Sequence, residues 1–345
     1  MVTVVTEWEP DVLAGYRQQT FELGSDPDGE GRLVATLVRL GEPSPSATRA
    51  VLVVHGFTDY FFHTDLANHL AGRGFAVYAL DLHKCGRSWR EGQTPHFTTD
   101  LARYDGELER ALDVIGAESS TADVLVYGHS AGGLIVSLWL DRMRNRGLIQ
   151  RKRVTGLVLN SPWLDLQGPA FLRAAPTRAA IAALSRMRKM SVVRPPTASG
   201  GYGSTLHRDY AGEFDYDLKW KPIGGFPVTV GWINAIRRGH ALLHRGLDVG
   251  VPNLILRSDR SVREVADPNT IQRGDAVLDV RQIARWAGCI GNRTTVVPIA
   301  DAKHDVFLSV PESRQAAYGE LDRWLDTHLA ETSDPTTQPE QGAAR

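Results

Sequence analysis

The chain of 345 residues contains only two cysteines, Cys85 and Cys289, which lie far apart in the sequence. Two isolated cysteines fit neither a zinc-binding spacing nor a disulfide framework, so we expect no metal site and a reducing compartment. Long apolar runs are also lacking, because no stretch of about 18 uninterrupted apolar residues occurs. The sequence therefore predicts no stable insertion into a membrane.

An excess of charge of one sign is absent too. Lys and Arg total 39 and Asp and Glu total 40, which gives a formal net charge of -1. This balance excludes the global positive field with which many proteins bind nucleic acid, so we expect no nucleic-acid partner. The first fifteen residues carry acidic side chains where a secretory signal peptide needs a basic start and an apolar run. We therefore expect a cytoplasmic protein.

One stretch carries a catalytic pattern. The apolar residues 124–127 precede Gly128-His129-Ser130-Ala131-Gly132, and a helical pattern follows at once. This is G-x-S-x-G between a strand and a helix, the context typical of a nucleophile elbow. Glycines two residues before and two after Ser130 lack a Cβ and let the chain turn sharply. We predict that Ser130 is a nucleophile; the alternative is a Gly/Ser turn that merely caps a helix.

Strand and helix patterns alternate through most of the chain. The predicted strands cover residues 16–22, 33–40, 50–54, 75–80, 124–127, 154–159, 252–256 and 294–298. The predicted helices cover residues 64–72, 98–115, 131–144, 170–190, 230–243, 279–286 and 312–329. The first two strands are separated by a turn-rich segment and predict an antiparallel hairpin. The remaining alternation predicts an α/β fold with a doubly wound, mostly parallel sheet.

The alternation stops between residues 161 and 250, which contain helix candidates but no convincing buried strand. We predict a core of residues 1–160 and 251–330, with 161–250 inserted as a mainly helical cap over the carboxyl ends of the strands, where such sheets bind ligands. Residues 331–345 predict a disordered tail. Within the cap, residues 170–194 hold six basic and no acidic side chains. Such a helix is either a solvated face or a surface for lipid or an anionic group.

A serine hydroxyl needs an imidazole base, and the imidazole needs an acid to orient it. His304 lies between the last predicted strand and the last predicted helix, where a base that follows the nucleophile and the acid in chain order belongs. We expect Asp275 to be the acid, because Asp-Ala-Val-Leu-Asp runs directly into a helix. Asp259, two residues beyond a strand end, and Asp165, after the preceding strand, are the alternatives.

An oxyanion hole requires two N–H groups near the position where the charge develops. We expect the backbone of Ala131, directly after the nucleophile, and that of Phe57, in the loop after strand 50–54, to supply them. The same loops place four further residues in a tentative substrate pocket: His55, Gly56, Tyr60 and His129.

Four stretches, VLVVHGFTDY, YALDLHKCGRS, YGHSAGGL and ADAKHDVF, resemble the α/β-hydrolase superfamily. They are most similar to its monoacylglycerol-lipase-like and lysophospholipase-like branch, also labelled serine aminopeptidase. The resemblance covers about residues 50–329. It implies a cofactor-free serine hydrolase that cleaves a small-molecule acyl ester, with lipid esters among the candidates. The chain departs from the D-x-x-G-x-G-x-S loop of this branch, because Lys84-Cys85-Gly86 occupies its centre.

The nucleophile type narrows the reaction class within this resemblance. Epoxide hydrolases and haloalkane dehalogenases of this fold use aspartate, so Ser130 favours acyl transfer to water. Serine does not distinguish a carboxylesterase from a thioesterase or an aminopeptidase. A member that binds a ligand under the cap without catalysis is the third hypothesis.

Overall fold

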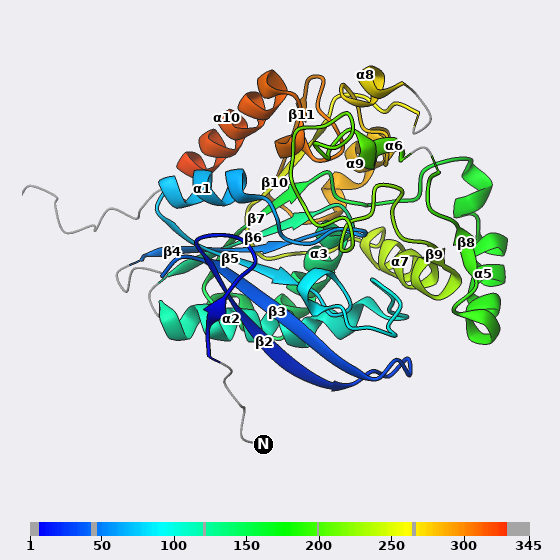
Figure 1. Ribbon diagram of the computed structural model, residues 1–345, viewed down its shortest axis with the longest axis horizontal. Coiled ribbons are helices and arrows are strands. Elements are labelled where there is room, and N and C mark those ends of the chain that lie inside the picture. Colours follow the sequence, from blue (N-terminus) through cyan, green and yellow to red (C-terminus); the bar gives the residue numbers. More distant parts are fainter. Residues whose placement is uncertain (1–6, 43–46, 120–121, 199, 264–266, 330–345) are drawn as a thin grey trace, which may run out of the picture.

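The structure is a computed structural model, and it describes residues 7–42, 47–119, 122–198, 200–263 and 267–329. The predicted tail, residues 331–345, lies outside the described residues. A nine-stranded sheet occupies the centre of the described part (Figure 1), with the order β1-β2-β3-β5-β4-β6-β7-β10-β11. The pairs from β5 to β11 are parallel, whereas β1, β2 and β3 run antiparallel to one another and β3 runs antiparallel to β5. The predicted fold class is confirmed.

The strands of the sheet are β1 Glu9–Pro10, β2 Tyr16–Ser25, β3 Arg32–Leu40, β4 Arg49–Val54, β5 Phe75–Asp81, β6 Asp123–His129, β7 Val154–Asn160, β10 Asn253–Ser258 and β11 Thr294–Ile299. A separate pair is formed by β8 Val192–Arg194 and β9 Val228–Thr229. The α-helices are α1 Thr64–Gly72, α2 Asp105–Glu118, α3 Ala131–Asn145, α4 Leu148–Arg151, α5 Ala175–Arg188, α6 Gly201–Ser204, α7 Val230–Leu243, α8 Pro268–Ile271, α9 Val280–Trp286 and α10 Pro311–His328. Short 3-10 turns are η1 Gly86–Ser88, η2 Leu101–Tyr104, η3 Ala170–Arg173, η4 Ala287–Cys289 and η5 Val306–Leu308.

Helices cover both faces of the sheet, so its central strands are apolar on both sides. In β4, Leu52 and Val54 belong to a core with residues of α2, α3 and α9, while Val51 and Val53 belong to a core with residues of α1 and α10. Figure 1 shows α1 and α10 on one side of the sheet and α2 on the other. This alternation explains why β4 reads as a continuous apolar run. No helix of the described residues has the length and apolar character needed to cross a membrane.

Two predicted helices differ from the structure. The helix predicted at 98–115 starts late, because Thr99 is held by the hairpin residue Asp28 and Asp100 caps the η2 turn; α2 begins only at Asp105. The helix predicted at 170–190 is divided into η3 and α5. Pro176 explains the new start of α5, since proline is tolerated in the first turn of a helix but not in its interior.

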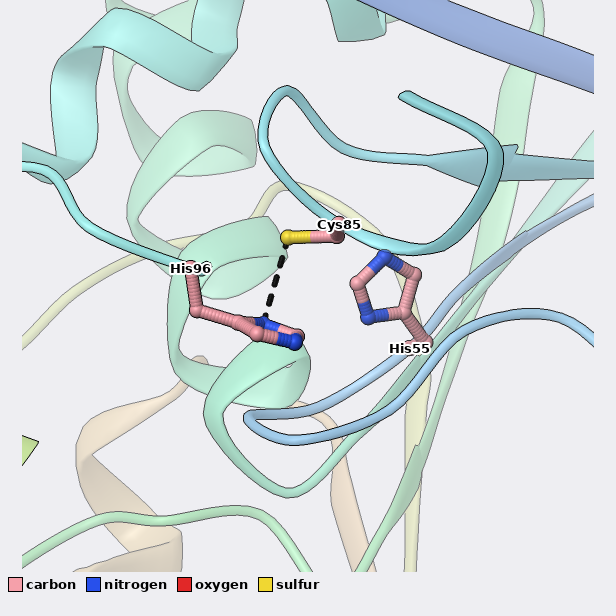
Figure 2. Close-up of side chains that lie close together, drawn as sticks. All are labelled: His55, Cys85 and His96. Carbon is pink, nitrogen blue, oxygen red and sulfur yellow. Dashed lines mark hydrogen bonds between the residues drawn. The ribbon is translucent and has the colours of Figure 1, made fainter. Parts of the chain in front are cut away.

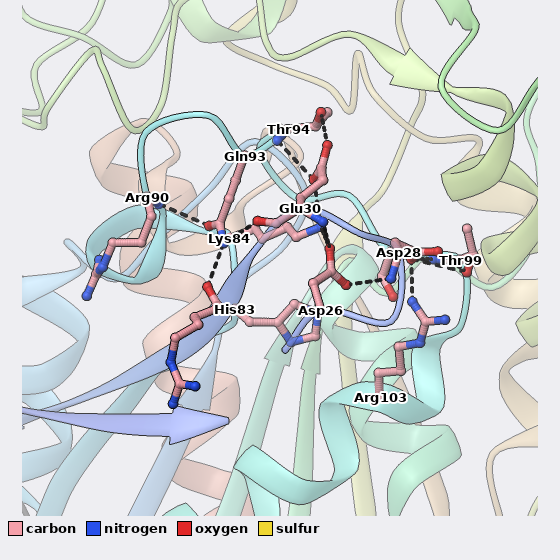
Figure 3. A network of polar contacts seen from close by, with 12 residues as sticks. Asp26, Asp28, Glu30, His83, Lys84, Arg90, Gln93, Thr94, Thr99 and Arg103 are labelled. Atoms are coloured by element: carbon pink, nitrogen blue, oxygen red, sulfur yellow. Dashed lines mark hydrogen bonds and ion pairs between the residues drawn. The ribbon is translucent and has the colours of Figure 1, made fainter. Parts of the chain in front are cut away.

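The tip of the β2–β3 hairpin holds the loop that follows β5 (Figure 3). Lys84 is fully buried and its Nζ lies 2.6 Å from Asp26 and 2.7 Å from Glu30. Its φ of 62° is in the left-handed region that favours glycine, which the resembled family has at this position. A buried ammonium persists only with such close counter-charges. The hairpin thus compensates for the departure from the family pattern.

Residues between β7 and β10 contribute no strand to the central sheet in the part of the chain described here. Helix α5 has no buried side chain and packs against α7. Helix α7 in turn places Ala235, Ile236 and Leu243 in the core next to α3. Figure 1 shows α5 and β8 at the periphery, away from the sheet.

Candidate active site

Ser130 occupies the turn between β6 and α3 with φ 52° and ψ -119°, a backbone conformation rarely adopted by a residue with a side chain. The flanking glycines are required by space. A Cβ on Gly128 would lie 2.7 Å from a methyl carbon of Val136, and one on Gly132 would lie 2.2 Å from the carbonyl oxygen of His55. The sequence pattern therefore produces the sharp turn for the expected steric reason.

Ser130 and His304 meet despite their separation in the sequence. Ser130 Oγ lies 2.9 Å from His304 Nε2, and His304 Nδ1 lies 2.9 Å from Asp275 Oδ2. The other oxygen of Asp275 accepts the backbone N–H groups of Val277 and Leu278 at 2.8 and 2.7 Å. Oδ2 therefore accepts a hydrogen bond from the N–H at His304 Nδ1. His304 Nε2 then accepts the hydroxyl hydrogen of Ser130, the arrangement that a general base needs.

The alternative acids lie elsewhere. Asp259 is exposed, forms an ion pair with Arg260 at 2.8 Å and accepts the N–H of Asp301. Asp165 accepts the indole N–H of Trp286. The chain leaves the end of β10, passes through α8 and returns at Asp275, where a β-bridge to Ser261 fixes the turn. Because of this additional segment, the carboxylate that meets His304 is that of Asp275 and not that of Asp259 at the end of β10.

The loop after β4 packs against the turn that holds Ser130. A Cβ on Gly56 would lie 2.9 Å from Ser130 Cβ, so the backbone of this loop runs in contact with the serine. Phe57 follows, and its ring packs on Trp232 with ring centroids 4.0 Å apart. Ala131 is the first residue of α3 and is buried. Phe57 and Ala131, the two residues predicted to supply the oxyanion donors, thus belong to the two segments that meet at Ser130.

A cavity of about 970 Å³, including its opening, reaches Ser130 and His304. Most of its wall is apolar, with Phe57, Trp163, Leu206, Ile223, Phe226, Val228, Trp232, Val277 and Leu278 among the lining residues. Of the four tentative pocket residues, only His129 belongs to the lining.

The other three tentative pocket residues serve the framework instead. His55 is buried and its ring bonds to the carbonyl oxygen of Gly56 and the N–H of Leu82, so both nitrogens are engaged. Gly56 contacts the serine from behind. Tyr60 accepts the N–H of Asp217 and packs in a separate apolar cluster. The assignment of these three residues to the substrate pocket stays a prediction, since none of them is among the described residues that line the cavity.

A second buried polar network lies beside the His304 ring and was not predicted. Asp305 accepts hydrogen bonds from His63 Nε2 at 2.9 Å and Asn160 Nδ2 at 2.7 Å. Burial alone would raise the pKa of Asp305, but nearby His129 and His63 hold it well below its ordinary value. Burial lowers the pKa of His129 to about 4, so this ring, next to His304, is neutral at neutral pH and carries a charge that acts on Asp305 only in acid. The sequence signal was the acid directly after His304; its partners are distant in sequence.

The cavity also contains a buried ion pair. Lys221 Nζ lies 2.8 Å from Asp59 Oδ1, and both residues line the cavity. Burial would raise the pKa of Asp59, but the charge of Lys221 keeps it well below its ordinary value. Asp59 Oδ2 is buried and has no hydrogen-bond partner in the described part of the chain. This pair and Arg194 form the charged part of an otherwise mainly apolar wall.

Figure 2 shows a third group, in which His55, Cys85 and His96 place ligand atoms within 4.8 Å of one another. Both nitrogens of His55 are already hydrogen-bonded, so two possible donors remain, whereas structural zinc uses four. Cys85 Sγ lies 3.2 Å from His96 Nδ1, and burial raises the pKa of this thiol well above its ordinary value. The geometry describes a packed hydrogen-bonded cluster with a neutral thiol.

The family model described as "Serine aminopeptidase, S33" matches residues 45–260, well over half of the chain. The chain belongs to this family of α/β hydrolases. The match ends before Asp275 and His304, so those two residues rest on the geometry alone.

Individual relatives are more distant. A phospholipase, YtpA of Bacillus subtilis (strain 168), is 28% identical over 119 residues, which cover 34% of this chain and only 41% of that protein. A soluble variant of a monoglyceride lipase from Saccharomyces cerevisiae, solved with a substrate analog, has a TM-score of 0.60 at 16% identity and covers 95% of this chain and 97% of its own. A monoacylglycerol lipase from Paleococcus ferrophilus has a TM-score of 0.57 at 18% identity, covering 90% and 99%. These similarities show the shared α/β-hydrolase fold.

Proposed function

We propose that the protein is a serine hydrolase that cleaves carboxylic esters through an acyl-enzyme on Ser130. The observation that carries the proposal is the chain of two 2.9 Å contacts from Ser130 through His304 to Asp275, at the wall of a mainly apolar cavity. His304 takes the hydroxyl proton as Ser130 attacks the acyl carbon and returns it to the leaving alcohol. Water, activated by the same imidazole, then releases the acid.

Each neighbouring group has a defined part in this reaction. Asp275 holds the imidazole in one tautomer and stabilises its cationic form. The N–H groups of Phe57 and Ala131 are the proposed donors to the oxyanion. The helix dipole of α3, whose N-terminus starts at Ala131, favours the same negative charge.

The cavity supports an ester with an apolar acyl group as the substrate. Its apolar wall receives a hydrocarbon chain, whereas the Asp59–Lys221 pair suits a polar alcohol group. The yeast and Paleococcus lipases and the Bacillus phospholipase are named for lipid esters. We also propose that residues 161–250 act as a cap over this cavity. Apolar side chains exposed on it, including Phe171, Met187 and Val192, favour contact with a lipid phase.

Hydrolysis of p-nitrophenyl esters over a range of acyl chain lengths tests the reaction. Ser130→Ala is expected to lower kcat by roughly four to six orders of magnitude. Ser137→Ala is the matched control, because Ser137 is a buried serine of the same helix whose hydroxyl bonds only to the Gly133 carbonyl among the contacts described. A fluorophosphonate probe should label Ser130. A protein that hydrolyses no ester of any length and leaves the probe unreacted would contradict the proposal.

The aminopeptidase alternative is less well supported by the charges of the site. An aminopeptidase binds the ammonium group of its substrate with an anionic group near the nucleophile. The one carboxylate among the residues that line the described cavity, Asp59, is already paired with Lys221. We therefore expect aminoacyl p-nitroanilides to react far more slowly than p-nitrophenyl esters. Acyl-CoA substrates test the thioesterase alternative in the same assay format.

A further inference from the structure

A second cavity, of about 580 Å³ including its opening, lies among η3, α5, α7 and α9. The described residues that line it are Asp165, Leu166, Arg173, Arg178, Arg237, His240, Ala241, His244, Arg285 and Trp286. The segment after β7 separates it from the catalytic cavity. Trp163 and Gln167 line the catalytic cavity, whereas Asp165 and Leu166 line the second one. No residue of the Ser130 site is among its lining residues.

The lining is strongly cationic. Four arginines surround the cavity, and Asp165 is the one carboxylate among the lining residues. Asp165 already accepts the indole N–H of Trp286 at 3.1 Å and lies 3.7 Å from Arg173. Burial and the nearby charge of Arg178 both lower the pKa of Arg237. Like charges gathered in a partly desolvated space repel one another, and a bound anion relieves that repulsion.

The remaining wall is aromatic and contains one unsatisfied nitrogen. His244 stacks on Trp286 with ring centroids 3.5 Å apart, and the guanidinium carbon of Arg285 lies 5.0 Å from the centroid of the Trp286 ring. His240 Nε2 donates to the Trp163 carbonyl at 2.8 Å, while its Nδ1 is buried and has no hydrogen-bond partner among the described residues. Arg173 already donates to the carbonyl oxygens of Leu166 and Gly168. The further guanidinium groups of the lining are those of Arg178, Arg237 and Arg285.

We infer that this cavity binds a phosphate monoester group. The oxygens of such a group accept hydrogen bonds from planar guanidinium groups, whose forked N–H donors match the geometry of phosphate. The cavity also leaves room beside the phosphate for the organic group that carries it. Phosphate monoesters occur both as small soluble molecules and as the headgroup of phosphatidate, and both share this chemistry.

Isothermal calorimetry with inorganic phosphate and with glycerol 3-phosphate tests the soluble source, and co-sedimentation with phosphatidate-containing vesicles tests the lipid source. The cavity variant is Arg178→Gln with Arg285→Gln; both side chains are exposed, so folding does not depend on them. The matched control is Arg186→Gln with Arg281→Gln, which removes the same charge from exposed positions of the same two helices outside the cavity. We expect the cavity variant to bind at least about tenfold more weakly than the control, since each arginine contributes a charge-assisted bond. Thermal unfolding verifies that all proteins are folded.

The outcomes separate the two sources. Saturable binding of the soluble phosphates, weakened in the cavity variant alone, assigns a small phosphate ligand. Binding of phosphatidate vesicles alone, lost in the same variant, assigns a lipid headgroup. Equal binding by the two double variants, or no binding to any of the three probes, overturns the inference. Calorimetry needs no catalytic turnover, so its result is independent of the proposed ester hydrolysis.

Discussion

Asp305 Oδ2 and His63 Nε2 lie 2.9 Å apart, and this pair joins the residue after His304, the proposed catalytic base, to the start of α1. Burial would lower the pKa of His63, but the hydrogen bond and charge of Asp305 raise it above its ordinary value. The pair is therefore a buried hydrogen bond strengthened by the negative charge of Asp305. Asp305 also accepts the N–H of Phe307, so the same carboxylate shapes the turn that presents His304.

Asp305→Asn is expected to destabilise the protein by about 1.5 to 3 kcal/mol, because the neutral amide removes the charge from the buried hydrogen bonds to His63 and Asn160. The matched control is Asp322→Asn, which removes the partner of His69 in a pair of similar length, 2.8 Å, that is partly exposed to solvent. Such an exposed pair contributes about 0 to 1 kcal/mol. Urea unfolding at neutral pH measures both. Equal losses in the two variants would show that burial does not set the strength of the Asp305 pair.

Asp275→Asn is expected to lower kcat for ester hydrolysis by roughly three to four orders of magnitude, because the amide no longer holds His304 in the tautomer that accepts the serine proton. Asp259→Asn is the control; this exposed carboxylate pairs with Arg260 and should leave kcat within about threefold of the wild type. Steady-state kinetics on one p-nitrophenyl ester compares them. A large loss in Asp259→Asn with little change in Asp275→Asn would reverse the assignment of the acid.

Local sequence patterns were sufficient to predict the part of the site that is formed by residues adjacent in the sequence. The strand before Ser130, the helix after it and the two glycines all act within one turn, so periodicity and glycine spacing were sufficient. The same holds for β4, which has apolar side chains on both of its faces. The sequence favoured Asp275 over Asp259 as the acid but did not decide between them, because long and short loops after β10 cost nearly the same free energy.

Contacts between distant segments were beyond the sequence. Asp305 and His63 are 242 residues apart, and Lys221 reaches Asp59 across 162 residues. The residues around Asp305 and around Lys221 do not indicate which distant residue each side chain will meet, because such contacts depend on the order of all strands in the sheet. The start of α2 was misplaced for the same reason, since Asp28 of the hairpin holds Thr99 outside the helix.

Gly132→Ala tests the close approach of α3 to the loop after β4. The added methyl group would lie 2.2 Å from the His55 carbonyl oxygen, so the helix start or the loop must shift. We expect a loss of about 1 to 3 kcal/mol in stability and at least about 100-fold in kcat, because Ser130 and the proposed oxyanion donors move apart.

Gly116→Ala is the control for Gly132→Ala. Gly116 lies in α2 with nothing within 4 Å of the new methyl group, so the change should stabilise the protein by about 0.5 to 1 kcal/mol and leave kcat unchanged. Kinetics and urea unfolding on both variants make the comparison. A Gly132→Ala enzyme with wild-type kcat would show that the elbow tolerates a displaced loop.

The free energy of unfolding should fall as the pH falls from about 6.5 to 4, in part because of His240. Burial lowers the pKa of His240 to about 4, whereas an unfolded histidine titrates near 6.5. Below pH 6.5 the histidine of the unfolded chain therefore binds a proton, whereas that of the folded protein stays neutral until about pH 4. The free energy of unfolding falls over this range, by roughly 3 kcal/mol for a full shift of this size. His240→Gln keeps an N–H for the Trp163 carbonyl and removes the titration. Urea unfolding in phosphate-free buffers of constant ionic strength should show a shallower pH dependence for His240→Gln than for the wild type. The difference in slope corresponds to at most one proton taken up on unfolding. Parallel pH profiles for the two proteins would show that His240 does not resist protonation in the folded state.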